Sequence, residues 1–146
     1  MLLRTTRFGT LNIAQDDVIT FPAGLLGLED CREWILLADA GNDSLCWLQS
    51  TNRAETALAV VSPRRFVPQY RFRTYRNELA PLQLADLDDA QVLTIVSQAE
   101  GRPTLNLKAP IVVNLRTRTA RQLVVNDDHP LQYVLPTTSA RIKKIA

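Results

Sequence analysis

The chain has 146 residues, of which 46% are hydrophobic and 22% charged, and its formal net charge is +2. These values are typical of one globular domain with its own core, and so weak a charge does not by itself indicate a nucleic-acid partner. No apolar run approaches the roughly 20 residues that span a bilayer.

Short strands separated by turn residues are predicted for the first half of the chain. Gly9 lies between two short segments and indicates a hairpin. Two later segments are apolar at nearly every position, which is typical of central strands covered on both faces. The predicted strands of this half are 2–8, 10–13, Val18–Phe21, Trp34–Ala38, Leu45–Ser50 and Ala57–Ser62.

The segment Phe21–Asp30, FPAGLLGLED, interrupts this series. One proline and two glycines break it too often for a regular element, yet it is too apolar for a solvated loop. We expect a structured loop in which Leu25, Leu26 and Leu28 are buried. It either closes one end of the fold or docks another protein surface.

The second half continues with a helical turn and further strands. A turn near Asp86–Ala90 is expected, with an aspartate as its cap. A strand follows at Val92–Gln98, and Gly101–Pro103 forms a turn. In Leu105–Val125, we predict a hairpin from the apolar runs Ile111–Leu115 and Leu123–Val125, preceded by an irregular segment. In the first run, the alternation predicts a core face of Ile111, Val113 and Leu115.

These elements predict an all-β fold, a small antiparallel β-barrel-like domain with short helical turns. We expect one domain over residues 1–136 and a flexible basic C-terminal tail over 137–146. The N-terminus lacks the apolar segment of a signal peptide, and Cys31 and Cys46 lack metal-site spacing. We therefore expect a cytoplasmic protein with free thiols.

Catalytic and metal-binding patterns are missing from the sequence. His129 is the single histidine and lies in a turn sequence, and no serine elbow, HExxH or phosphate-binding glycine loop is present. The paired aspartates lie in turn-like segments, where capping explains them. We expect no enzymatic activity, no cofactor, no metal, no small-molecule substrate and no membrane partner.

A loop of interleaved arginines and aromatic residues, Arg64–Arg76, is the sharpest binding candidate from the residues alone. Guanidinium groups and exposed rings together would suit single-stranded nucleic acid. The alternative is that the rings anchor the loop to the core while the arginines face water. Asn52, after the strand Leu45–Ser50, leaves a similar choice between turn former and partner contact.

Several of these segments occur together in one known family. The pieces RTTRFGTLNI, ITFPAGLLGLED, WLQS, ALAVVSP, VPQY, NLKAPIVVN and RQLVV with DDHPL span nearly the whole chain. In this combination, and especially in FPxGLxG, LQS and NLKAPI, the chain resembles the FliW family of bacterial flagellar assembly factors. Leu28, His129 and Gln132 depart from the residues usual in that family.

The resemblance implies a non-enzymatic cytoplasmic protein that binds flagellin and the translational repressor CsrA. Partner switching then relieves CsrA repression of flagellin mRNA translation, without direct nucleic-acid contact by the FliW protein. We expect partner contacts first at the turn after WLQS, then in the arginine-rich loop and before Pro110. The candidate residues, in that order, are Asn52, Gln49, Phe66, Pro68, Tyr70, Asn106 and Lys108.

Overall fold

The computed structural model describes residues 1–136. Its strands are β1 (Leu2–Thr5), β2 (Gly9–Asn12), β3 (Val18–Thr20), β4 (Glu33–Ala38), β5 (Cys46–Ser50), β6 (Ala57–Val61), β7 (Ala90–Ala99), β8 (Arg102–Leu105), β9 (Ile111–Asn114), β10 (Thr119–Gln122) and β11 (Tyr133–Val134). One short α-helix and four 3-10 turns connect them: α1 (Arg76–Leu79), η1 (Gln15–Asp17), η2 (Pro63–Arg65), η3 (Ala80–Leu82) and η4 (Leu87–Asp89). The expected tail lies outside the described residues.

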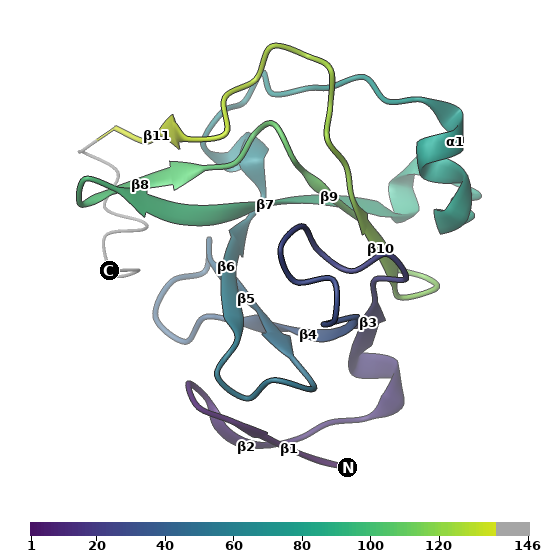
Figure 1. Ribbon diagram of the computed structural model, residues 1–146, viewed down its shortest axis with the longest axis vertical. Helices are drawn as coiled ribbons and strands as arrows, with labels where there is room; N and C mark the ends of the chain where they lie inside the picture. Colours follow the sequence, from purple (N-terminus) through teal and green to yellow (C-terminus); the bar gives the residue numbers. More distant parts are fainter. Residues whose placement is uncertain (137–146) are drawn as a thin grey trace.

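Seven strands close into a barrel, which Figure 1 shows as a ring. Neighbouring strands follow the order β7-β6-β5-β4-β3-β10-β9, and β9 pairs again with β7. These pairs are antiparallel except for β10 and β3, which run parallel where Thr119 lies beside Thr20. Because the ring is closed, each of its seven strands has a neighbouring strand on both sides. The predicted all-β, barrel-like fold with short helical turns is confirmed.

The long strand β7 pairs with two other strands along one of its edges. Its first part, 90–93, pairs with β9, and its last part, 96–99, pairs with β8. The segment 106–110, NLKAP, carries the chain from β8 to β9, and the Asn106 N–H still donates to the Ile95 carbonyl at 3.0 Å. β8 and β11 thereby extend as a small sheet beyond the barrel (Figure 1).

The barrel interior is filled by apolar side chains from the strands and from the loop that follows β3. Phe21 and Leu25 of this loop are 0% and 1% exposed and pack with Trp34, whose ring meets Phe21 edge-on at 6.4 Å. Figure 1 shows the loop in the middle of the ring. The expectation of a structured loop is confirmed, and of the three leucines expected to be buried, Leu25 is.

Outer faces of the strands are covered as well. Trp47 of β5 and Val61 of β6 pack with Tyr70 from the arginine-rich loop, while η3 covers β9 through Leu82 and Val112. This double coverage explains why β5 and β6 are apolar on both faces. The helical turn near Asp86 is also present: Asp86 Oδ1 accepts from the Asp88 N–H at 3.0 Å.

The predicted hairpin is shifted relative to the structure. Asn114 Oδ1 accepts from the N–H groups of Arg116 and Thr117, so the turn begins directly after Asn114. Leu115 therefore lies in the turn and is 42% exposed, which makes its core assignment wrong. The second strand is β10, not Leu123–Val125, because the tight turn brings Thr119 opposite Asn114.

Several other expectations need correction. Leu26 is 62% exposed, because the loop turns outward between its two glycines, Gly24 and Gly27. Leu28 is only partly buried, packed against the interior cluster. The turn expected at Gly101–Pro103 is shorter, because Arg102 and Pro103 already belong to β8. The strand expected over 2–8 ends at Thr5, and residues 6–8 form the turn before Gly9, which begins β2. α1, η3 and β11 were not predicted, since each is too short to show a period. No helix of the described residues is long and apolar enough to cross a membrane.

Candidate functional site

The turn between β5 and β6 is built around the buried hydroxyl of Ser50. Ser50 Oγ donates to Asn52 Oδ1 at 2.8 Å, and it accepts from the N–H groups of Asn52 and Arg53 at 3.3 and 3.1 Å. One donor and two lone pairs are the full capacity of a hydroxyl. The Ser50 hydroxyl therefore helps to fix the conformation of this turn.

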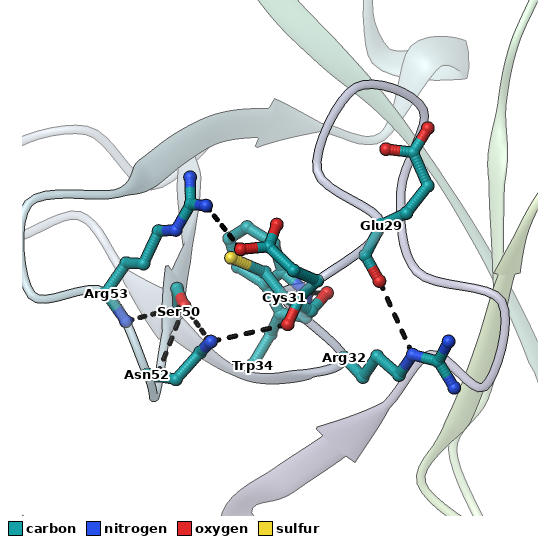
Figure 2. A network of polar contacts seen from close by, with 8 residues as sticks. Glu29, Cys31, Arg32, Trp34, Ser50, Asn52 and Arg53 are labelled. Atoms are coloured by element: carbon teal, nitrogen blue, oxygen red, sulfur yellow. Dashed lines mark hydrogen bonds and ion pairs between the residues drawn. The ribbon is translucent and has the colours of Figure 1, made fainter.

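Asn52 joins this turn to the loop Phe21–Asp30. Its Nδ2 donates to the Asp30 carbonyl at 3.3 Å, while the Arg53 guanidinium forms an ion pair with the Asp30 carboxylate (Figure 2). Both ion-pair side chains are about half exposed, so the pair contributes at most about 1 kcal/mol. Asn52 is exposed, but both polar ends of its side chain have partners in the chain. We call this group, Asp30, Ser50, Asn52 and Arg53, the turn network.

The loop beside the turn network depends on glycine. Gly24 has φ +70°, and a Cβ there would lie 2.7 Å from the Glu29 Cα. The backbone closes through hydrogen bonds from Gly24 N–H to the Phe21 carbonyl and from Leu28 N–H to the Leu25 carbonyl, both 2.8 Å. The loop thus folds back on itself, with its start inside the barrel.

The end of this loop is tied to the barrel by Trp34. Its indole Nε1 donates to the Cys31 carbonyl at 2.9 Å, and both residues are 0% exposed (Figure 2). On the other side, the Leu26 N–H donates to Gln122 Oε1 at 2.9 Å. The loop is therefore held by β4 and by β10, and the exposed Leu26 side chain projects from a fixed backbone.

Gln49 shapes the turn from within. It is 0% exposed, and its Nε2 donates to the carbonyls of Ser50, Arg53 and Ala54 at 3.0, 3.3 and 3.2 Å. Its Oε1 has no hydrogen-bond partner within residues 1–136. Because Gln49 is buried, it can affect partner binding only indirectly, through the turn backbone that it holds. Its role in binding stays a prediction.

Phe66, Pro68 and Tyr70 lie at the opposite end of β6 from the turn network. Tyr70 is 3% exposed, and its hydroxyl donates to the Leu107 carbonyl at 2.8 Å. Burial raises the pKa of the Tyr70 phenol, and the charge of Asp127 raises it further. Phe66 is half-buried, and Pro68 is exposed. Of these three residues, Pro68 alone offers an exposed side chain.

The side chains of Asn106 and Lys108 form hydrogen bonds within the chain. Asn106 Oδ1 accepts from the Ala109 N–H at 3.0 Å, which forms the bend before Pro110. Lys108 Nζ donates to the Asp127 carbonyl at 2.8 Å. Both residues are half-buried and pin the irregular segment between β8 and β9.

The predicted site residues thus fall into two separate groups. Asn52 and Gln49 share the turn after β5, whereas the others gather where Tyr70 meets Leu107. The sequence reasoning missed Ser50, Asp30 and Arg53, although a serine followed by Asn52 is a recognisable turn signal. No group of three or more His, Cys, Asp or Glu side chains suited to a metal ion occurs in the part of the chain that the structure describes.

Comparisons with known proteins agree with this architecture. The family profile described as FliW protein matches residues 2–135. A flagellar assembly factor FliW of Bdellovibrio bacteriovorus is 41% identical over 132 residues, covering 88% of this chain and 75% of that protein. One of Alkaliphilus metalliredigens is 32% identical, covering 92% and 86%.

A solved structure gives the same result. The crystal structure of the flagellar assembly factor FliW superposes with a TM-score of 0.85 and 25% sequence identity, covering 93% of this chain and 97% of that one. The similarity therefore extends over nearly the whole fold. On the family match over residues 2–135 and the identity to these relatives, the chain belongs to the FliW family.

Proposed function

We propose that this chain is a cytoplasmic flagellar assembly factor that binds flagellin and the repressor CsrA in exchange. Free flagellin would occupy the protein and leave CsrA active, and secretion of flagellin would release the protein to antagonise CsrA. The observation that carries the proposal is family membership over almost the whole chain, because the matched relatives are named flagellar assembly factors.

The turn network supports this proposal as the place of contact. It presents the exposed residues Asn52 and Arg53 on a backbone that Ser50 and Gln49 hold from beneath. A preorganised surface loses little conformational entropy when a partner binds. Leu26 adds an exposed apolar side chain on the loop joined to this turn. Exchange between two proteins requires such a surface and no catalytic step.

Size-exclusion chromatography of the purified protein with CsrA and, separately, with flagellin tests the proposal. We expect co-elution with each partner. Adding flagellin to the preformed CsrA complex should release CsrA, because partner switching requires coupled affinities. Absence of co-elution with both proteins would contradict the proposal, and a stable ternary complex would contradict partner exchange.

A pair of asparagine variants locates the contact. Asn52→Ala removes an exposed side chain of the turn network, and Asn77→Ala removes one from α1. We expect Asn52→Ala to weaken CsrA binding about tenfold, a loss typical of an interface hot spot. Asn77→Ala should leave it unchanged. Equal affinities of both variants for CsrA would show that the turn network is not part of the interface.

A further inference from the structure

Three arginines of the arginine-rich loop hold their guanidinium groups out of the hydrogen bonds of the fold. Residues 64–76 include five arginines and no acidic residue, although the whole chain is only +2. The side chains of Arg71, Arg73 and Arg76 are exposed, and their guanidinium groups form no hydrogen bond or ion pair with residues 1–136. This local concentration of positive charge faces solvent.

The backbone beneath these charges is held in place. Arg64 Nε donates to the Tyr70 carbonyl at 2.9 Å, and the Arg73 N–H donates to Asp127 Oδ1 at 2.9 Å. His129 Nε2 lies 2.7 Å from the Arg71 carbonyl, and its ring packs on Tyr70 at 4.8 Å. The backbone of the loop is therefore ordered before binding, and only the arginine side chains lose rotamer freedom when a partner binds.

Two neighbouring hollows lie along this loop. One, of about 640 Å³, lies between the segment 71–75 and Asp127. The other, of about 600 Å³, lies between Arg64 and the start of β7, and both are lined by Arg71 and Phe72. We call the two hollows together the arginine groove.

The lining of the arginine groove combines charge with apolar surface. Ala90, Val92 and Phe72 line the second hollow, beside Leu87, which is 78% exposed. Arg64 and Arg71 line the same hollow. Guanidinium groups beside apolar side chains complement a carboxylate next to an apolar side chain.

Nucleic acid fits this surface less well. Of the four aromatic residues of the loop, Tyr75 alone is exposed, whereas Tyr70 is buried and Phe66 and Phe72 are half-buried. Base stacking needs several exposed rings.

We propose that the arginine groove binds a short acidic segment of a partner protein, in which carboxylates flank an apolar side chain. The carboxylates would pair with Arg71 and Arg73, and the apolar side chain would lie against Phe72 and Val92. The proposal does not depend on CsrA or flagellin binding at the turn network, which lies at the other end of β6. Residues 137–146 do not suit the groove, because their charged side chains are all basic.

Fluorescence anisotropy with a labelled synthetic peptide of Asp, Glu and Leu residues tests this proposal. We expect saturable binding that weakens as salt is added. The double variant Arg71→Ala/Arg73→Ala should weaken binding by about tenfold or more, since two charge-assisted contacts are lost. Arg71→Lys/Arg73→Lys should give a smaller loss, because lysine keeps the charge without the bidentate geometry.

The matched control removes two arginine charges from surfaces outside the arginine groove. Arg4 in β1 and Arg116 in the β9–β10 turn are exposed, so Arg4→Ala/Arg116→Ala should bind the peptide as the unchanged protein does. A second peptide with serine in place of leucine should bind about tenfold more weakly, because it has no apolar side chain. Thermal unfolding of both double variants should match that of the unchanged protein.

Four results would overturn the proposal. They are no binding of the acidic peptide, equal weakening by the control double variant, equal binding of the serine peptide, and tighter binding of oligothymidine at the same arginines. The last result would assign the groove to nucleic acid. A fifth result, self-association that the Arg71→Ala/Arg73→Ala change abolishes, would also overturn the proposal and assign the groove to a second copy of this chain.

Discussion

The turn network and the arginine groove are both formed by irregular loops, yet they differ in whether their exposed polar side chains are bonded within the chain. In the turn network, Asn52 and Arg53 bond to Asp30 of the neighbouring loop. In the arginine groove, the guanidinium groups of Arg71 and Arg73 have no such partner within residues 1–136. The first region is therefore suited to recognition by a fixed shape, and the second to recognition by charge.

A buried aromatic residue anchors the loop in each region. Phe21 enters the barrel interior, whereas Tyr70 packs on the outside of the barrel and also forms a hydrogen bond. The loop beside the turn network thus depends on apolar burial, and the arginine-rich loop depends on both burial and one polar contact. This difference can be measured by substitutions in each loop.

The largest effect is expected at Phe21. Because Phe21 is 0% exposed and its ring meets Trp34, Phe21→Ala should lower the free energy of unfolding by about 3–5 kcal/mol. Leu26→Ala, in the same loop but 62% exposed, should change it by less than about 0.5 kcal/mol. Urea unfolding monitored by tryptophan fluorescence gives both values. Similar losses for the two variants would mean that Phe21 is not the anchor.

Substitutions at two glycines with nearly the same φ distinguish the cost of backbone strain from the cost of steric crowding. Gly9 has φ +71° and open space where a Cβ would lie, whereas at Gly24, with φ +70°, a Cβ would meet the Glu29 backbone. Gly9→Ala should cost about 1 kcal/mol from the left-handed conformation alone. Gly24→Ala should cost about 2–4 kcal/mol, since backbone must also move. Equal costs in urea unfolding would show that the loop adapts freely.

The polar anchor of the arginine-rich loop is tested by Tyr70→Phe. This change leaves the buried Leu107 carbonyl without its donor and should cost about 1–2 kcal/mol. Tyr75→Phe, at a residue 66% exposed, is the control and should cost less than about 0.5 kcal/mol. If thermal unfolding shows no difference between the two, the hydroxyl of Tyr70 does not hold the loop.

The smallest effect is a pH dependence at Asp127. The Arg73 N–H, which donates to the carboxylate, holds the pKa of Asp127 below its ordinary value, and the charges of His129 and Arg73 act in the same direction. A lowered folded-state pKa stabilises the fold above the ordinary carboxyl pKa of about 3.9, and this contribution is lost as the pH falls through the folded value.

Asp127→Asn should therefore lower the melting temperature slightly at pH 7, and the difference should shrink as the pH falls below about 4. Melting curves from pH 7 to pH 3 measure it, with Asp128→Asn as the neighbouring control. A difference that stays constant over this range would show that the carboxylate charge is not involved.

Local sequence patterns predicted much of the barrel. The apolar runs of β5 and β6, a first hairpin and the aspartate-capped turn at Asp86 are all present, although the hairpin turn lies at residues 6–8 and Gly9 begins β2. Closure of the ring depends on pairing of β7 with β9 and of β10 with β3, between residues far apart in the sequence. Periodicity along one segment carries no information on such pairs.

The candidate site was predicted in part. The turn after β5 was expected from Asn52, but the burial of Gln49 and the bond from Asn52 to Asp30 depend on how β4 places its preceding loop. Arginines and rings interleave between 64 and 76, yet only the fold decides that Tyr70 turns inward and Arg71 outward. The choice between anchoring rings and a stacking platform therefore required the structure.

The most direct test of the account is the affinity for CsrA measured by isothermal titration calorimetry for three proteins: the unchanged chain, Asn52→Ala and Arg71→Ala/Arg73→Ala. If the turn network is the contact surface, Asn52→Ala should weaken binding about tenfold, and the double variant should bind as the unchanged chain does. Unchanged affinity for Asn52→Ala together with a large loss in the double variant would contradict the account.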